Sequence, residues 1–218
     1  MSEFIKRLLS SLVLIPLALF FIIKGSIFFK FFMVIFFIIA AYEWNSLSKK
    51  KNYKIPGFIF LLVSICFTIL LRGNTNTELF IFLITILICV ATDVGGYIFG
   101  NIFKGPKINK SISPNKTYAG SIGGYLLSII SVYFFLQKSF LLEDSISNNF
   151  GIDELIWVIL ISTISQIGDF IISFFKRKSK LKNTGSIIPG HGGLLDRTDG
   201  MIFAIPFAYI FLTLFSNY

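Results

Sequence analysis

The sequence predicts an all-α fold: a polytopic integral membrane helix bundle of about seven transmembrane helices, with the N-terminus in the cytoplasm. Three observations lead to this prediction. Of the 218 residues, 55% are hydrophobic and only 14% are charged, which sets the chain apart from ordinary soluble domains. The apolar residues form successive runs of the length that a helix needs to cross a bilayer. The basic residues gather in the short segments between these runs.

Each expected helix is an apolar run with polar residues at its ends. Lys6 and Arg7 precede the first run, and the turn 24–26 separates it from the second. A basic stretch, 49–54, precedes the third run, and the polar turn 72–77 precedes the fourth. The fifth run lies between a lysine-rich loop and an acidic loop. The expected spans are Leu8–Ile23, Ile27–Tyr42, Ile55–Leu71, Leu79–Tyr97, Tyr118–Leu136, Leu155–Phe175 and Gly200–Phe215.

The distribution of charge sets the expected orientation. With the N-terminus inside, sixteen of the twenty Lys and Arg residues fall on the cytoplasmic side, as is typical of cytoplasmic loops. The net charge of +9 is therefore attributed to membrane topology, and we expect no nucleic-acid partner. We divide the chain into N-terminal transmembrane helices, 1–92, and a second transmembrane region, 93–218, which contains the polar motifs.

The stretch from Ser173 to Asp199 is polar and basic although it lies between two apolar runs. It contains six of the twenty basic residues and the only histidine, His191. Its four glycines allow positive φ and a close approach to a ligand, and backbone N–H groups in such turns can bind anions. Asp196 and Asp199 face one side if a helix begins between them, and carboxylates so placed hold hard cations. The composition indicates a site for phosphate and a divalent metal ion.

Two of the expected spans carry a carboxylate near their cytoplasmic ends. One helical face of the sixth span carries Ser162, Gln166, Asp169 and Ser173. Asp169 lies about 6 Å from the end of this span, at 1.5 Å per residue, and Asp93 is placed similarly on the fourth span. A carboxylate inside a bilayer costs about 2.5–3.5 kcal/mol on insertion scales, so it normally faces a bundle interior or a wet cavity. Each carboxylate is therefore either a metal ligand or a structural partner of a Lys or Arg.

A second polar motif, Ser113-Pro114-Asn115-Lys116-Thr117, directly precedes the fifth span. The proline sets a turn, while Ser113 and Thr117 supply hydroxyl groups and Lys116 supplies charge for a phosphate at a helix N-terminus. The alternative is an ordinary helix cap beside an interfacial lysine. These residues alone favour that alternative.

The stretch that begins at Ser173 resembles the signature of the phosphatidate cytidylyltransferases, the integral membrane enzymes that make CDP-diacylglycerol. The matching positions are Ser173, Lys176, Arg177, Lys182, Gly185, Pro189, His191, Gly192, Gly193, Asp196, Arg197 and Asp199. One position departs from the pattern, because Asn183 stands where the family usually has Asp. The motif 113–117 resembles a second family motif, Ser-Pro-x-Lys-Thr, and the residues around Asp93 and Asp169 also resemble the family.

The resemblance implies that 93–218 is the catalytic region and that 173–199 is a cytoplasmic signature loop. The implied activity transfers CMP from CTP to phosphatidic acid and releases pyrophosphate. The implied cofactor is Mg²⁺, held by Asp169, Asp196 and Asp199, with Asp93 as a weaker candidate. Of these carboxylates, Asp169 and Asp196 are the favoured pair. The implied location is the inner (plasma) membrane, with membrane lipids as partners, and a homodimer is left open.

Roles follow from the same resemblance. The expected catalytic residues are Lys176, Lys182, Asp196 and Arg197, whose cations would stabilise charge on the leaving pyrophosphate. The expected substrate-binding residues are Ser113, Lys116, Thr117, Ser173, Arg177, His191, Gly192 and Gly193. His191 is assigned to ligand contact or loop shape rather than to proton transfer, because the attacking phosphate monoester is already mostly ionised at neutral pH.

Two alternatives stay open. A CTP-dependent polyprenol or dolichol kinase would act on a lipid alcohol, which needs a base to remove its proton. An ion-coupled transporter would bind its ion at Asp93 and Asp169. A transporter site is expected near the bilayer midplane, whereas the charges of this chain gather at one membrane face.

Overall fold

The computed structural model describes residues 3–49, 51–138, 150–190 and 192–215, which are mostly helical. Long helices occupy the positions of the expected spans: α1 (Glu3–Lys24), α2 (Ser26–Leu47), α3 (Lys54–Arg72), α4 (Asn76–Phe103), α5 (Tyr118–Lys138), α6 (Ile152–Lys178) and α8 (Met201–Phe215). Within the described residues, five helices, α2 to α6, are long and apolar enough to cross a membrane. The apolar parts of α1 and α8 are shorter, Leu9–Lys24 and Met201–Phe215. The membrane helix bundle is thus confirmed, and the count of seven spans stays a prediction.

The fold is mostly helical, as predicted, but the lysine-rich loop expected between α4 and α5 contains two short strands. There α4 continues past Tyr97 to Phe103, and a hairpin follows, formed by β1 (Lys107–Asn109) and β2 (Ser113–Thr117). The strands are antiparallel, with Lys107 opposite Thr117. Pairing satisfies backbone N–H and C=O groups that an extended segment would leave open. Pro114 is tolerated because both strands of a two-stranded sheet are edge strands.

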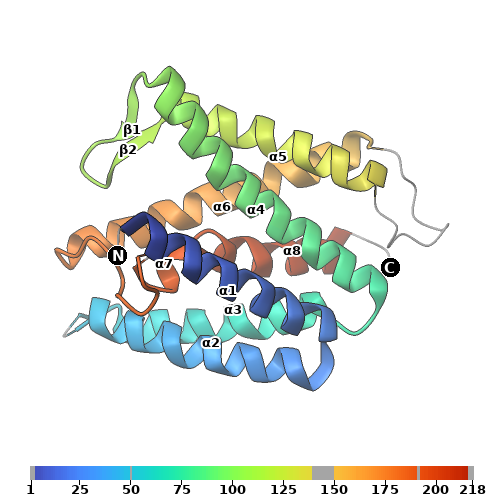
Figure 1. Ribbon diagram of the computed structural model, residues 1–218, viewed down its shortest axis with the longest axis horizontal. Helices are drawn as coiled ribbons and strands as arrows, with labels where there is room; N and C mark the ends of the chain where they lie inside the picture. Colours follow the sequence, from blue (N-terminus) through green and yellow to red (C-terminus); the bar gives the residue numbers. More distant parts are fainter. Residues whose placement is uncertain (1–2, 50, 139–149, 191, 216–218) are drawn as a thin grey trace.

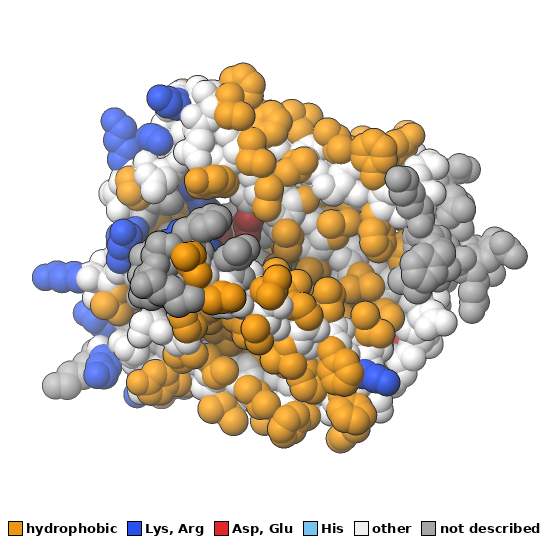
Figure 2. All heavy atoms as spheres, viewed as in Figure 1, with side chains coloured by type: hydrophobic (Ala, Val, Ile, Leu, Met, Phe, Trp, Pro, Cys, Tyr) orange, Lys and Arg blue, Asp and Glu red, His pale blue; other side chains and the backbone are white. Residues whose placement is uncertain are grey.

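The helices pack side by side along the bundle (Figure 1). Helices α2 and α3 run along one side and α5 along the opposite side, with α6 and α8 between them. Helix α4 runs obliquely across the bundle, from the hairpin beside α5 toward the side of α2 and α3, and α1 lies toward the viewer. The end of α2, the end of α4, the hairpin and the end of α6 gather at one end of the bundle. Figure 2 shows Lys and Arg side chains gathered at this end and hydrophobic side chains over much of the remaining face.

Helices α4 and α5 approach each other closely because glycines lie between them. A Cβ on Gly120 would lie 2.7 Å from the carbonyl oxygen of Gly96, and one on Gly124 would lie 2.9 Å from that of Thr92. Small residues at this spacing let membrane helices pack backbone to backbone. The close contact fixes the start of α5, and therefore the hairpin, beside the last turns of α4.

A compact apolar cluster supports the signature loop. It joins side chains of α2, α3, α6, α8 and a short helix, α7 (Leu195–Thr198), which ends the loop. Its buried members are Ala40, Trp44, Leu47, Leu61, Ile172, Leu195 and Ile202. The loop therefore lies on a packed base that includes the N-terminal helices.

Candidate active site

The last turns of α6 place three predicted site residues on one helical face. The Ser173 hydroxyl donates to Asp169 Oδ1 at 3.3 Å. Lys176 follows one turn later and is almost buried, with 8% of its surface exposed. Residues three or four apart share a face of an α-helix. This face of α6 meets the end of the signature loop, where Asp196 and Asp199 lie.

Lys176 joins the two loop carboxylates. Its Nζ lies 3.0 Å from Asp196 Oδ1 and 3.8 Å from Asp199 Oδ2. The carboxyl groups of Asp199 and Asp169 interact electrostatically. Burial raises the pKa of Asp199 well above its usual range, the Asp169 carboxylate raises it further, and the Lys176 ammonium opposes both. The site therefore holds more negative charge than its buried lysine neutralises, and an added cation would favour the ionised form of Asp199.

Lys116, in strand β2 of the hairpin, contacts the same group of charged residues. Its ammonium forms an ion pair with Asp169 Oδ2 and lies 5.7 Å from the centre of the Phe170 ring. Thr117 is buried, and its Oγ1 accepts a hydrogen bond from the Gly120 N–H at 3.0 Å. The helix-cap interpretation of this motif is therefore confirmed for Thr117, while Lys116 faces the acidic end of α6.

Asp93, on α4, completes a group of charges drawn from four parts of the chain. Its carboxylate interacts electrostatically with Asp169, Lys116 and Arg197. Asp199 in turn interacts with both Asp93 and Asp169. Carboxylates from α4, α6 and the signature loop thus converge at one end of the bundle.

These carboxylates fit a hard cation that is shared with a ligand. Among the described residues, no group of three or more His, Cys, Asp or Glu side chains lies close enough to hold a metal ion. Mg²⁺ is commonly held by one or two carboxylates together with substrate phosphates. Asp169 and Asp199, whose carboxyl groups interact electrostatically, supply two such carboxylates. The pairing of Asp169 with Asp196 stays a prediction.

Asp196 also organises the signature loop. Its Oδ2 accepts hydrogen bonds from the backbone N–H groups of Thr184 at 2.9 Å and Gly193 at 3.0 Å. Gly192 next to this contact has φ of 87°, a conformation that glycine adopts readily. A Cβ on Gly192 would also lie 3.0 Å from Asp196 Oδ2. Asp196 therefore holds the loop closed while its other oxygen accepts from Lys176.

Glu43, on α2, is a site residue that sequence reasoning missed. Its side chain is completely buried. Oε2 accepts from the Thr184 hydroxyl at 2.8 Å and the Leu195 N–H at 2.9 Å. Oε1 accepts from the Leu194 N–H at 2.7 Å. Glu43 therefore binds both sides of the signature loop, and the signal in the sequence was a single carboxylate directly after an apolar run.

The turn 188–192 of the signature loop contacts α1. The Ile188 N–H donates to the Gly192 carbonyl at 2.9 Å, which closes the turn. The Arg7 Nε–H donates to the Gly190 carbonyl at 2.8 Å, and the Ser10 hydroxyl donates to the Pro189 carbonyl at 3.1 Å. This contact was not predicted either, since nothing local to α1 indicates it. His191, which was predicted to bind substrate, lies outside the described residues.

The other predicted residues lie around this centre. The Arg177 Nε–H donates to the Ile112 carbonyl at 3.2 Å, so Arg177 connects α6 to the hairpin. Lys182, Asn183 and Arg197 are exposed. Within the described residues, no ion pair is formed by Lys182. Ser113 begins β2, opposite Asn109.

Comparison with known proteins is consistent with this arrangement. Residues 57–215 match the model of the Cytidylyltransferase family. A phosphatidate cytidylyltransferase of Rickettsia typhi is 34% identical over 202 residues, which cover 92% of this chain and 88% of that protein. One of Rickettsia bellii is 31% identical over 216 residues, covering 95% and 90%. One of Brucella suis is 29% identical over 180 residues, covering 83% and 63%.

Proposed function

This chain belongs to the cytidylyltransferase family, and we propose that the residues at the end of α6 carry out its reaction. Relatives named phosphatidate cytidylyltransferase match most of the chain. The chain is accordingly a nucleotidyltransferase of CDP-diacylglycerol synthesis, with CTP and phosphatidate as substrates. These relatives give no support to the polyprenol kinase or the transporter alternative.

The reaction sets the demands on the site. An oxygen of the phosphatidate phosphate attacks the α-phosphorus of CTP and forms a new P–O bond. The bond between that phosphorus and the oxygen bridging to the β-phosphorus breaks, and pyrophosphate leaves with the electron pair. The attacking phosphate monoester is mostly ionised at neutral pH, so no side chain has to remove its proton. Catalysis then consists of positioning the two phosphates and neutralising their charge.

The observation that carries this proposal is the set of alternating charges around Asp169. Lys116 forms an ion pair with Asp169, Asp169 interacts electrostatically with Asp199, and Lys176 forms an ion pair with Asp199. The carboxylates can hold a cation, and the lysines can bind phosphate oxygens once that cation neutralises the carboxylates. Because these groups lie near the ends of the apolar helices α4 and α6, a lipid phosphate and a water-soluble nucleotide can both reach them.

Mg²⁺ is the proposed cofactor. Asp169 and Asp199 would hold it, with Asp196 and Asp93 as further candidate ligands, and the bound ion would supply positive charge between the reacting phosphates. Removing divalent metal with a chelator should therefore abolish turnover, and added Mg²⁺ should restore it. Full turnover in the presence of excess chelator would contradict this assignment.

The protein's own residues divide between the two substrates. Lys116, with the hydroxyl of Ser113, would bind the lipid phosphate at the hairpin, while the buried Thr117 caps α5 and would hold them in position. Lys176 and Lys182, assisted by Arg197, would bind the nucleotide phosphates and stabilise the leaving pyrophosphate. Further proposed contacts to the substrates come from Ser173, Arg177, His191, Gly192 and Gly193.

The proposed location is the cell inner membrane, with the site facing the cytoplasm. This orientation places sixteen of twenty basic residues inside, as the positive-inside rule favours. It also places the signature loop where CTP is available. Labelling of single introduced cysteines in intact cells tests the orientation, since a cysteine at the exposed position Lys182 should be protected from a reagent that does not cross membranes.

The function is tested by incubating the purified protein in detergent with Mg²⁺ and CTP labelled in its α-phosphate. Phosphatidic acid and polyprenol are offered in separate reactions. Label that enters an organic-soluble lipid only with phosphatidic acid supports the cytidylyltransferase. Labelled CDP released with polyprenol, without any labelled lipid, would show a lipid kinase instead.

Asn183 allows a test of the one departure from the family pattern. Asn183→Asp should leave turnover unchanged or raise it. The position is exposed, and the Asn side chain already supplies one acceptor oxygen where Asp would supply two. Steady-state rates of the purified variant and wild type measure the effect. Inactivation by this change would show that the loop of this chain differs from the family's in its use of that position.

His191→Ala should raise the KM for a substrate more than it lowers kcat. The reason is that the attacking phosphate needs no base, which leaves ligand contact or loop shape as the role of His191. Both constants are measured across pH. A loss confined to kcat, together with a shifted pH profile, would instead assign proton transfer to His191.

A further inference from the structure

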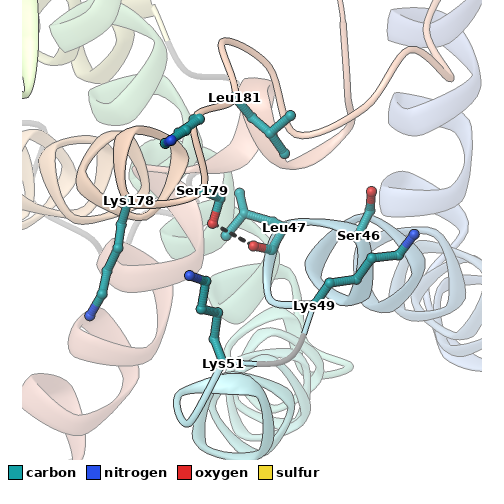
Figure 3. Close-up of a pocket in the computed structure, with 8 residues that line it drawn as sticks. Ser46, Leu47, Lys49, Lys51, Lys178, Ser179 and Leu181 are labelled. Carbon is teal, nitrogen blue, oxygen red and sulfur yellow. Dashed lines mark hydrogen bonds between the residues drawn. The ribbon is translucent and has the colours of Figure 1, made fainter.

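A basic pocket lies where α2 ends, α3 begins and α6 ends (Figure 3). Its volume is about 350 Å³, near the lower end of the roughly 300–1,000 Å³ of small-molecule sites. Its polar lining consists of Ser46, Lys49, Lys51, Lys178, Ser179 and Lys180. None of the described residues that line it is acidic. A pocket with four lysines, two hydroxyls and no carboxylate is suited to an anion.

Three of the four lysines of this pocket have amines that are available to a ligand. Within the described residues, Lys49, Lys51 and Lys180 have no carboxylate partner. In Figure 3, the amine of Lys51 points toward the contact between Ser179 and Leu47, where the Ser179 hydroxyl donates to the Leu47 carbonyl. Lys178 points away from it, and its Nζ lies 5.0 Å from the centre of the Tyr53 ring.

Lys180 occupies a backbone position that ordinarily suits glycine. It follows the last turn of α6 with φ of 56°, in the left-handed region where helices commonly end in Gly or Asn. The Leu181 N–H donates back to the Lys176 carbonyl at 2.9 Å and closes this helix end. A lysine at this backbone position is strained, and Lys180 is one of the residues that line the pocket.

The pocket is separate from the candidate active site. At 3.6 residues per turn, Lys178 points about 180° away from Asp169 around the axis of α6. Asp169, Ser173 and Lys176 face the hairpin and the end of the signature loop, whereas the pocket faces the connection between α2 and α3. An anion bound in the pocket therefore does not occupy the carboxylate cluster.

We propose that this pocket binds the phosphate of an anionic ligand, and that a membrane lipid headgroup supplies it. Helices α2, α3 and α6 are all apolar enough to span the membrane, so the residues at their ends lie at the depth of lipid phosphates. Tyr53 and the exposed Phe174 beside Lys178 are the kind of aromatic side chain found at this depth. Clustered lysines at the membrane surface attract anionic lipids.

The test measures binding of fluorescent phosphatidylglycerol to the full-length protein in detergent, with fluorescent phosphatidylcholine as the neutral probe. Phosphatidylglycerol is chosen because phosphatidate is a substrate and would also report the active site. The pocket variant is K49Q/K51Q/K180Q. The matched control is K104Q/K107Q/K110Q, which removes the same charge at the end of α4 and in the hairpin and leaves the pocket unchanged.

The pocket variant should bind phosphatidylglycerol at least about tenfold more weakly, while the control variant binds like wild type. Inorganic phosphate, added as competitor, identifies the source of the anion. Little displacement at high concentration supports a lipid headgroup, and ready displacement that depends on the pocket lysines would overturn the lipid assignment in favour of a soluble phosphate. Equal weakening in both variants would overturn the proposal, because net charge alone would then explain the binding.

Discussion

Replacing Asp169 with Asn should lower kcat by about 100-fold or more, the scale of losing one group that neutralises transition-state charge. Asp169 is ion-paired with Lys116 and interacts electrostatically with Asp199. Asn keeps the size of the side chain but removes the charge that would hold the metal ion and orient Lys116. Initial rates with CTP and phosphatidic acid measure the effect, and a thermal melt of the purified protein shows whether the variant is folded.

Asp153→Asn is the matched control for this change. Asp153 is exposed in the first turn of the same helix, α6, at its opposite end. Removing its charge should alter kcat by no more than about twofold, as for most surface substitutions. Asp199→Asn should resemble Asp169→Asn, because the two carboxyl groups act together. Near-normal turnover by a folded Asp169→Asn protein would exclude Asp169 as a metal ligand.

Replacing Glu43 with Gln should lower kcat at least about tenfold, although Glu43 lies on an N-terminal helix. Its two oxygens accept three hydrogen bonds from Thr184, Leu194 and Leu195. Gln has one acceptor oxygen, so its NH₂ group must face an N–H donor of the buried loop, and an unsatisfied buried group costs about 1–3 kcal/mol. The loop then loses the geometry that Asp196 and Lys176 share. The measurement is kcat and the KM for each substrate.

Glu78→Gln separates a positioning role of Glu43 from a general loss of stability. Glu78 lies in the first turn of α4, far from the signature loop, and also accepts three hydrogen bonds, from Asn74 N, Thr75 N and Thr75 Oγ1. Both variants should melt at lower temperature than wild type. Only Glu43→Gln should lose turnover at a temperature where both are folded, with a raised KM for CTP. Equal activity of the two folded variants would show that Glu43 is only structural.

Glu43→Asp adds a second readout for the same residue. Asp keeps the negative charge and both acceptor oxygens but is shorter by one methylene, so it reaches the loop less well. We expect activity between those of wild type and Glu43→Gln. Full activity in Glu43→Asp together with loss in Glu43→Gln would show that charge matters more than reach. No recovery relative to Glu43→Gln would show that the position of the oxygens is what counts.

Much of the helical architecture could be predicted because its signals are local. Apolar runs and the polar residues between them predict where the helices lie, and α2 to α6 confirm these positions, although α2 and α4 continue past their predicted ends to Leu47 and Phe103. The hairpin could not be predicted in this way. Its strands are short and polar, with Pro114 in β2, so neither alternation of apolar residues nor strand propensity marks them.

The candidate site could be predicted only in part, for a related reason. The spacing of Asp169 and Ser173 predicts one helical face, and their hydrogen bond on α6 confirms it. The contact of Lys116 with Asp169 joins residues 53 positions apart in the sequence. The contact of Glu43 with Leu195 crosses 152 positions. No local pattern carries such pairings.

The class of protein and the positions of most helices follow from the sequence alone, because hydrophobic runs and motif spacing are local patterns. Which carboxylates meet, and what holds the signature loop, depends on how the helices pack against one another. The physical reason is burial, because a buried carboxylate is costly unless it accepts hydrogen bonds. Glu43 accepts them from Leu194 and Leu195, which lie in a loop more than 150 positions later in the chain.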